Sequence, residues 1–270
     1  MVSRVVDRTF RLTDREKEVF RCVMRKAAGF SGIEILTYAV MSNHFHILAR
    51  VPEQPELGEG ELLRRVGILR GESAAAALGR QWEEWKKKGL GCLVERDCGA
   101  LRKRMGDLSV FVKLLKQCYS VSYNSRHKRA GTLWEGRFKS VLVEDTGAAL
   151  SAFAAYIDLN AVRAGIAEDP AEYRWCGYAE AVAGPGAARA GIASALREEW
   201  GKWAEVQARY RGLLYEEGEE RRRADGSVRR KGFSAEAVRK VLEAGGQLPM
   251  AQLLPCRVKF STWFHTNWAL

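Results

Sequence analysis

The chain has 270 residues, of which 47% are hydrophobic, and carries a formal net charge of +11. This length and composition predict a soluble globular protein, built as one large domain with appended elements or as two domains. Its six cysteines form no C-x-x-C pair, and neither a secretory leader nor a bilayer-spanning apolar segment is evident, so we expect a cytoplasmic protein with reduced thiols and no membrane partner.

The basic excess is concentrated between Leu101 and Ser140. This stretch contains ten lysines and arginines but only two acidic residues, Asp107 and Glu135. The ten are Arg102, Lys103, Arg104, Lys113, Lys116, Arg126, Lys128, Arg129, Arg137 and Lys139. Such clustering favours a polyanionic partner, most simply nucleic acid, over an evenly solvated surface.

The N-terminal part predicts a strand, a helix and a hairpin. Residues 1–8 suit a short strand, and Thr13 to Glu16 resembles a capping box that opens an amphipathic helix, which Gly29 closes. Two apolar runs follow, Ile33 to Val40 and His44 to Val51, and only three residues separate them. They predict two antiparallel strands joined by a tight turn.

His44 and His46 share one face of the second of these strands, because successive strand side chains point to opposite faces. Two imidazoles directed at one point are a candidate metal site. The alternative is that they are two polar residues on a solvated strand face.

The next stretch is predicted to be helical. Residues 56–107 have helical character without a clear apolar face, and we interpret them as a helical insertion. Leu108 to Arg126 follows a 3.6-residue period and predicts a better-formed helix. It carries Tyr119 and Tyr123 four residues apart, which would suit a two-tyrosine DNA-nicking enzyme or an ordinary packed helix face.

A basic turn with interleaved aromatic residues follows this helix. Its Gly-punctuated segment offers phosphate contacts beside Trp134, which either stacks on an unpaired base or anchors a surface hairpin. The candidate DNA-binding residues are Arg126, Lys128, Arg129, Trp134, Arg137 and Lys139. Residues 141–143 then read as a strand.

Residues 149–165 predict a helix that ends near Gly165 and places Tyr156 and Asn160 on one face. A phenol beside a carboxamide, presented to two histidines, supplies a nucleophile next to a third metal ligand. A phenol oxygen can attack a phosphodiester if a divalent cation neutralises charge on the phosphate oxygens.

Three blocks in this order, residues 44–46, 131–140 and 156–165, resemble the single-tyrosine transposases, most closely the REP-associated tyrosine transposases. The resemblance covers residues 1–184 and includes a family-like block at 173–178. It implies an HUH-type α+β fold, ferredoxin- or RRM-like, with an antiparallel sheet flanked by helices. Ala161 departs from the proline usual after the helix asparagine, a change that affects helix termination and no ligand.

The resemblance also implies a site and a substrate. His44, His46 and Asn160 would bind Mg²⁺ or Mn²⁺, and Tyr156 would be the nucleophile that forms a 5′-phosphotyrosine. The substrate would be single-stranded DNA folded into imperfect hairpins. The resemblance thus implies a transposase-like DNA nickase and strand-transferase, either monomeric or homodimeric. A catalytically quiet DNA-binding relative and a relaxase or replication initiator remain alternatives.

The region beyond residue 184 is predicted to be separate. The Gly- and Pro-containing run at 183–187 reads as a linker, and 185–270 as a helical accessory region. Helices are expected over 193–214, 234–243 and 248–254, and the last two, around Gly245 and Gly246, could form a DNA-binding helix-turn-helix. We assign no role to His265 in the aromatic final stretch.

Overall fold

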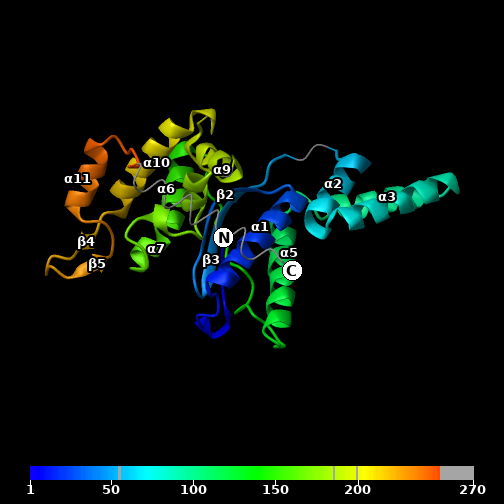
Figure 1. Ribbon diagram of the computed structural model, residues 1–270, viewed down its shortest axis with the longest axis horizontal. Coiled ribbons are helices and arrows are strands. Elements are labelled where there is room, and N and C mark those ends of the chain that lie inside the picture. Colours follow the sequence, from blue (N-terminus) through cyan, green and yellow to red (C-terminus); the bar gives the residue numbers. More distant parts are fainter. Residues whose placement is uncertain (54–55, 185, 199, 250–270) are drawn as a thin grey trace. The chain divides into compact units, whose positions relative to one another are not determined.

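The computed structural model describes residues 1–53, 56–184, 186–198 and 200–249, and it combines helices with a small antiparallel sheet (Figure 1). The α+β class is confirmed at this level. Contacts between residues divide the chain into two units. The sheet unit comprises Met1–Leu12, Ile35–Leu48 and the chain from Gly136, and the helical unit comprises Thr13–Glu34 and Ala49–Glu135.

The main sheet has three strands, β1 (Val2–Arg4), β2 (Glu34–Val40) and β3 (His44–Arg50), in the order β1-β3-β2. The Met41 N–H donates to the His44 carbonyl at 2.8 Å and closes the predicted hairpin. Strand β1 pairs with β3 antiparallel, with Val2 opposite His46. The histidine strand is therefore the central one.

The predicted strand over residues 141–143 is absent. The backbone of Val2 exchanges two 2.8 Å hydrogen bonds with Lys139, but this is an isolated bridge. Beyond it, Val141 and Leu142 are 70% and 98% exposed. The apolar run predicted a strand, but a strand also needs a paired edge, which these residues do not have; of the three, only Val143 packs against the core.

The core of the sheet unit is helical. It contains α6 (Gly147–Asp158), the short α7 (Asn160–Arg163), α8 (Gly177–Ala183), α9 (Gly186–Leu196) and α10 (Trp203–Gly218). Two single-turn 3-10 helices, Pro170–Glu172 and Trp200–Lys202, connect them.

The predicted boundary near residue 184 does not separate two units. Ile192 of α9 and Tyr210 of α10 are fully buried in the same cluster as Leu36 of β2 and Ala154 of α6. A Cβ placed on Gly191 would lie 2.5 Å from the carbonyl oxygens of two β2 residues, so this glycine allows α9 to approach the strand closely. Apolar residues on both sides of the run at 183–187 share one core, so this run does not mark a boundary between two units.

The chain continues into a small hairpin and a helix. Strands β4 (Arg221–Arg222) and β5 (Val228–Arg230) pair antiparallel, and α11 spans Ala235–Glu243. Ser234 caps α11 by accepting a hydrogen bond from the Ala237 N–H, which confirms the predicted helix start. The predicted helix at 248–254 and the final stretch with His265 lie largely or wholly outside the described residues.

The helical unit begins with α1 (Asp14–Ser31), whose N-cap is Thr13, as predicted. The helix ends at Gly32, with φ +68°, rather than at Gly29. Gly29 lies inside the helix, where a Cβ would come within 2.9 Å of the Ile68 side chain. This glycine therefore provides room for a neighbouring helix instead of a stop signal.

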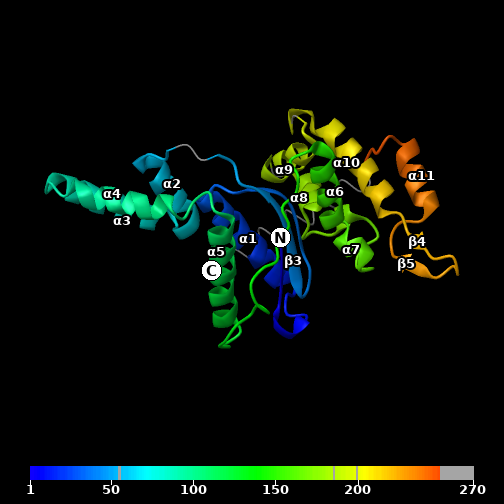
Figure 2. The ribbon, with the colours of Figure 1, turned by 180° about the vertical axis from the view of Figure 1, so that it is seen from behind.

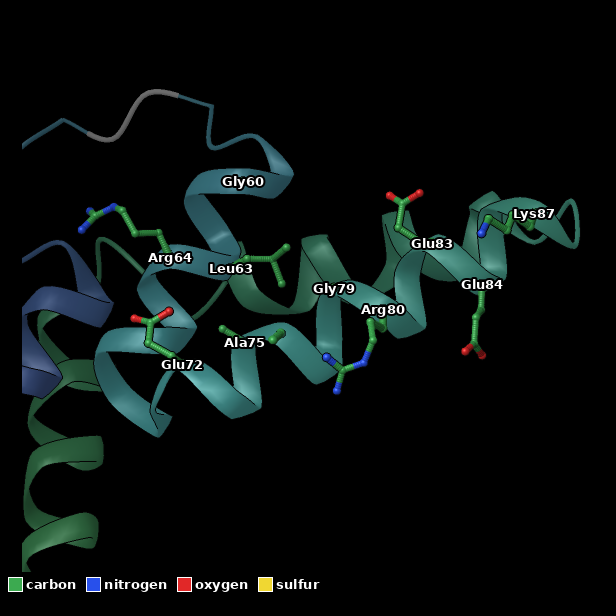
Figure 3. Close-up of a pocket in the computed structure, with 11 residues that line it drawn as sticks. Gly60, Leu63, Arg64, Glu72, Ala75, Gly79, Arg80, Glu83, Glu84 and Lys87 are labelled. Carbon is green, nitrogen blue, oxygen red and sulfur yellow. The ribbon is translucent and has the colours of Figure 1, made fainter.

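The insertion is helical, as predicted, and consists of α2 (Glu59–Arg70), α3 (Glu72–Lys87) and α4 (Gly91–Arg102). An open groove lies along α2 and α3 beside Leu63, Ala75 and Gly79. Figure 3 shows that the charged side chains around it, including Arg80 and Glu83, point in different directions and do not converge. We therefore assign this groove no chemistry.

Helix α5 spans Leu108–Arg126 within its predicted bounds, and Asp107 caps it. Within the described residues, Cys22, Cys92, Cys98, Cys118 and Cys176 are free thiols. No helix in this part of the chain is long and apolar enough to span a bilayer.

Candidate functional site

His44 and His46 lie on the same face of β3, as the strand period predicts. Their ring centroids are 5.0 Å apart and the rings are nearly perpendicular. Phe45 and Ile47, on the opposite face, are fully buried. Both imidazoles are half-buried, so this face is neither core nor open solvent.

Both histidines are held neutral. Burial lowers the pKa of His44, and the positive charge of Arg4, its cross-strand neighbour, lowers it further. Burial lowers the pKa of His46 to about 4, with His44 and other positive charges nearby adding to the effect. At neutral pH each ring therefore keeps a nitrogen lone pair that can bind a metal.

Asn43 sets the tautomer of His44. Its side-chain Nδ2 donates to the Arg8 carbonyl at 3.1 Å, which leaves Oδ1 to accept from His44 Nδ1 at 2.6 Å. The proton of the neutral ring then sits on Nδ1, and Nε2 carries the free lone pair. This is the kind of supporting hydrogen bond that orients histidine ligands in metal sites. Sequence reasoning treated Asn43 only as a turn residue.

Tyr156 lies beside this pair. Its ring centroid is 6.1 Å from that of His46, in an edge-on arrangement, and the side chain is 49% exposed. The guanidinium carbon of Arg163 sits 4.9 Å from the tyrosine ring centroid. The phenol is thus accessible to a substrate, next to two imidazoles and one fixed positive charge.

Asn160 follows one helical turn after Tyr156, but the predicted single helix is broken between them. Helix α6 ends at Asp158 and α7 starts at Asn160. The Asn160 side-chain nitrogen donates to the carbonyls of Tyr156 and Ile157 at 3.1 and 3.0 Å. These bonds satisfy carbonyls that the end of α6 leaves unpaired, and they leave the amide oxygen of Asn160 as an acceptor.

The donor types fit a divalent cation that prefers nitrogen and oxygen ligands. Within the described ranges, no three His, Cys, Asp or Glu side chains form a metal-binding group. The available protein donors are two neutral imidazoles and, one turn from Tyr156, the Asn160 amide oxygen. Such a set suits Mg²⁺ or Mn²⁺ held with water or substrate oxygens rather than a closed structural metal site.

Asp158, two residues after Tyr156, anchors helix α6. Its buried carboxylate accepts hydrogen bonds from the hydroxyls of Thr37 and Tyr210 at 2.9 and 2.7 Å, and from the Tyr178 N–H at 3.1 Å. These bonds connect α6 to β2, α10 and α8. Burial raises the pKa of Asp158 to about 6. An acidic residue between the apolar Ile157 and Leu159 was the available signal for this role.

A glycine makes that anchor possible. A Cβ on Gly177, at the start of α8, would lie 2.1 Å from Thr37 Oγ1. Only glycine lets the α8 N-terminus come close enough for the Tyr178 N–H to reach the carboxylate.

The basic turn is divided between the two units. In the helical unit, Arg126 forms an ion pair with the buried Glu16 at 2.5 Å. Trp134 is only 6% exposed, and its indole N–H donates to Ser120 Oγ at 2.8 Å. Of the two roles considered for Trp134, the structure supports the anchoring one, because no open ring face is presented for stacking.

The other candidate DNA-binding residues are mostly exposed. Lys128 lies on the surface, and Arg129, half-buried, donates to the Thr132 carbonyl at 3.2 Å. In the sheet unit, Arg137 and Lys139 are exposed, and Lys139 pairs with Val2, the residue opposite His46. Their binding to phosphate stays a prediction.

The tyrosine pair of α5 belongs to the core of the helical unit. Tyr119 is fully buried, and its hydroxyl donates to Glu16 Oε2 at 3.0 Å. Burial and this carboxylate raise the pKa of Tyr119 well above its ordinary value. Tyr123 is 5% exposed. Neither phenol is available for attack, so the packed-helix interpretation is confirmed.

Comparisons with known proteins add no relative. No family model, curated protein or solved structure matches this chain.

Proposed function

We propose that this protein is a metal-dependent, transposase-like nickase and strand-transferase that cuts single-stranded or hairpin DNA with Tyr156. The single observation that carries the proposal is the accessible phenol of Tyr156 next to two neutral imidazoles, His44 and His46. A pure binding protein needs basic and aromatic residues but no such combination. The HUH-type fold implied by the resemblance is part of the same proposal.

The reaction would be a displacement at phosphorus. The Tyr156 oxygen attacks the scissile phosphate, a Tyr–O–P bond forms and the P–O3′ bond breaks. The 3′ oxygen leaves and takes up a proton, while the 5′ phosphate stays on the tyrosine. Attack by a 3′-hydroxyl of another strand reverses these steps and rejoins DNA.

Residues around the phenol would support this chemistry. The positive charge of Arg163, 4.9 Å from the ring, attracts the phosphate. Asn43 holds His44 with Nε2 free, and His46 stays neutral. A divalent cation bound by His44, His46 and Asn160 would supply charge neutralisation at the non-bridging phosphate oxygens.

Of the alternatives, a two-tyrosine relaxase or initiator is disfavoured because Tyr119 is buried against Glu16. A catalytically quiet DNA-binding protein would keep the basic residues and lose turnover. The experiment below separates it from the enzyme.

The test is to incubate the protein with Mn²⁺ and a DNA hairpin that has single-stranded flanks, and to look for a covalent adduct by mass spectrometry. We expect a 5′-phosphotyrosine on Tyr156 and a free 3′-hydroxyl on the released strand. Tyr156→Phe should abolish adduct and cleavage but keep DNA affinity.

Tyr123→Phe is the matched control, because it removes one phenol oxygen from a tyrosine of the other unit. It should retain cleavage. Loss of cleavage in Tyr123→Phe with retention in Tyr156→Phe would contradict the assignment. Binding without cleavage across a panel of hairpins and metals would favour the quiet binding protein.

A further inference from the structure

The β4–β5 hairpin carries a second concentration of positive charge, which the sequence analysis did not connect with DNA. Residues 221–231 contain six basic side chains and one acidic one, Asp225. The six are Arg221, Arg222, Arg223, Arg229, Arg230 and Lys231. Nearly all of this segment is solvent-exposed. We call it the basic hairpin.

The basic hairpin is a defined structural element. Its tip is a Gly turn: Gly226 has φ +80°, and Asp225 Oδ1 accepts from the Ser227 N–H and hydroxyl at 2.8 and 2.6 Å. The Arg223 N–H donates to the Ser227 carbonyl at 2.8 Å and closes the tip. Its charges are therefore presented on an ordered turn.

The base of the hairpin is fixed to the core. Phe233 is buried and stacks on Tyr215 with ring centroids 4.0 Å apart, and its backbone N–H donates to the Gly218 carbonyl at 2.8 Å. A Cβ on Gly232 would lie 1.9 Å from that same carbonyl oxygen, so the two chain segments are in close contact. The hairpin is thus attached firmly to the end of α10.

Most of its charges lack an ion-pair partner. Among the described residues, Arg222 pairs with Glu220 at 2.7 Å, and it is the one hairpin residue with such a pair. Four glutamates at 216, 217, 219 and 220 precede the hairpin, but they belong to the end of α10 and the base. Negative charge is therefore concentrated before the hairpin, and positive charge lies along the hairpin itself.

The basic hairpin lies next to the end of the nucleophile motif. A Cβ on Gly165 would be 3.5 Å from Lys231 Nζ. Figures 1 and 2 show the hairpin beside α7, and Arg163 of α7 in turn covers the ring of Tyr156.

We propose that the basic hairpin is a phosphate-binding arm that holds the DNA strand as it runs past Tyr156. This rests on the proposed function, since it assigns the partner of the hairpin from the proposed substrate of the neighbouring site. Arginine guanidinium groups suit phosphate oxygens, and unpaired ones lose no existing ion pair on binding. A membrane surface fits less well, because apart from Ala224 and Val228 the hairpin offers no apolar side chain for insertion.

The test uses the full chain with Tyr156→Phe, so that DNA is bound without being cut. Arg221→Gln, Arg229→Gln and Lys231→Gln are combined, and affinity for a fluorescent DNA hairpin with single-stranded flanks is measured against salt concentration. Three lost phosphate contacts should reduce the slope of log affinity against log salt by about 2, at about 0.7 per contact. Affinity at low salt should fall at least about tenfold as counterion release is lost.

The matched control removes three positive charges from the exposed insertion, as Arg80→Gln, Lys87→Gln and Lys88→Gln. If both triple variants lose affinity equally, or neither does, the hairpin has no special role and the proposal is overturned. Loss of binding to phosphatidylserine vesicles with unchanged DNA binding would overturn it in favour of a membrane.

Cleavage by the chain with Tyr156 intact separates this inference from the proposed function. The hairpin variant should raise KM and leave kcat near the parent value, because its residues do not contact the reacting atoms. If the parent never cuts DNA but the hairpin variant still binds it less tightly, the proposed function fails and the arm stands. If the parent cuts DNA and hairpin and control variants bind equally, only the arm fails.

Discussion

Helices α5 and α6 each carry a candidate tyrosine, Tyr119 and Tyr156, and these two side chains have opposite surroundings. Tyr119 of α5 is fully buried and hydrogen-bonded to Glu16, and a carboxylate neighbour stabilises the neutral phenol. Tyr156 of α6 is half-exposed and lies beside His46 and Arg163. In both helices the sequence signal was a pair of residues four apart. Burial and the charge of the neighbours must therefore decide which phenol can react.

The same contrast holds for the basic residues. Arg126 is tied to the buried Glu16, and Trp134 fills the interior of the helical unit. Arg137 and Lys139 remain exposed in the sheet unit. A charge run can therefore contain both structural ion pairs and exposed basic side chains. The following predictions test this division.

The largest expected effect is on DNA cleavage, and it distinguishes the two histidines of β3 from His127 of the helical unit. His44→Ala or His46→Ala should reduce Mn²⁺-dependent cleavage by more than about 100-fold, because losing a ligand should exceed the roughly 10–100-fold effect of losing a supporting partner. His127→Gln, which removes the imidazole that contacts Glu16 in the other unit, should keep the parent rate. Cleavage is measured by gel assay. An equal loss of cleavage in the His46 and His127 variants would contradict this prediction.

The next effect concerns stability. Trp134→Ala should lower the free energy of unfolding by about 3–5 kcal/mol, since it leaves a large cavity in a buried site. Tyr156→Ala, at an exposed position, should change it by less than about 1 kcal/mol. Urea denaturation gives both values. A mild effect of Trp134→Ala together with weaker DNA binding would restore the stacking role for this ring.

The third prediction uses the buried carboxylate that holds α6. Asp158 has a pKa of about 6 against an ordinary 3.8, so the folded protein binds this proton more tightly than the unfolded chain does. The associated stabilisation, about 3 kcal/mol, is fully present below pH 3.8 and lost as pH rises through 6. Between pH 4 and 7.5 the free energy of unfolding of the parent should fall, relative to that of Asp158→Asn, by about 2 kcal/mol, most of this amount. A difference that is independent of pH would show that Asp158 does not titrate there.

The smallest effect is on salt dependence. Arg137→Gln and Lys139→Gln should each reduce the slope of log affinity against log salt by about 0.7. Arg126→Gln should leave the slope closer to the parent value and lower stability instead, because its charge is already paired with Glu16. The reverse pattern would mean that Arg126 leaves its partner to bind DNA.

Local signals predicted much of the fold. Three kinds of prediction depend only on neighbouring residues, and they are confirmed. They are the helix caps at Thr13 and Ser234, the three-residue turn before His44 and the alternation along β3. The proximity of Tyr156 to the histidines came from the motif resemblance rather than from periodicity. The structure then supplied the geometry.

What the sequence did not reveal depends on contacts between distant segments. Gly29 reads as a helix stop, whereas Gly29 and Gly191 both lie inside helices and allow close packing there. Residues 141–143 have strand composition but no pairing partner. The hydrogen bonds of Asp158 and the tautomer of His44 depend on which distant groups meet in the fold. Composition does not predict these contacts.

The three groups that donate hydrogen bonds to Asp158 also bear on how fast Tyr156 can move. The Asp158 carboxylate lies two residues after Tyr156 and connects α6 to β2, α8 and α10. Sliding or rotating α6 would break these bonds in the interior, a rearrangement of the kind that takes microseconds to milliseconds. Rotation of the exposed phenol about its own side-chain bonds takes picoseconds to nanoseconds. The ring can therefore sample substrate orientations rapidly on a stationary backbone, and alignment with a scissile phosphate becomes a matter of torsion angles.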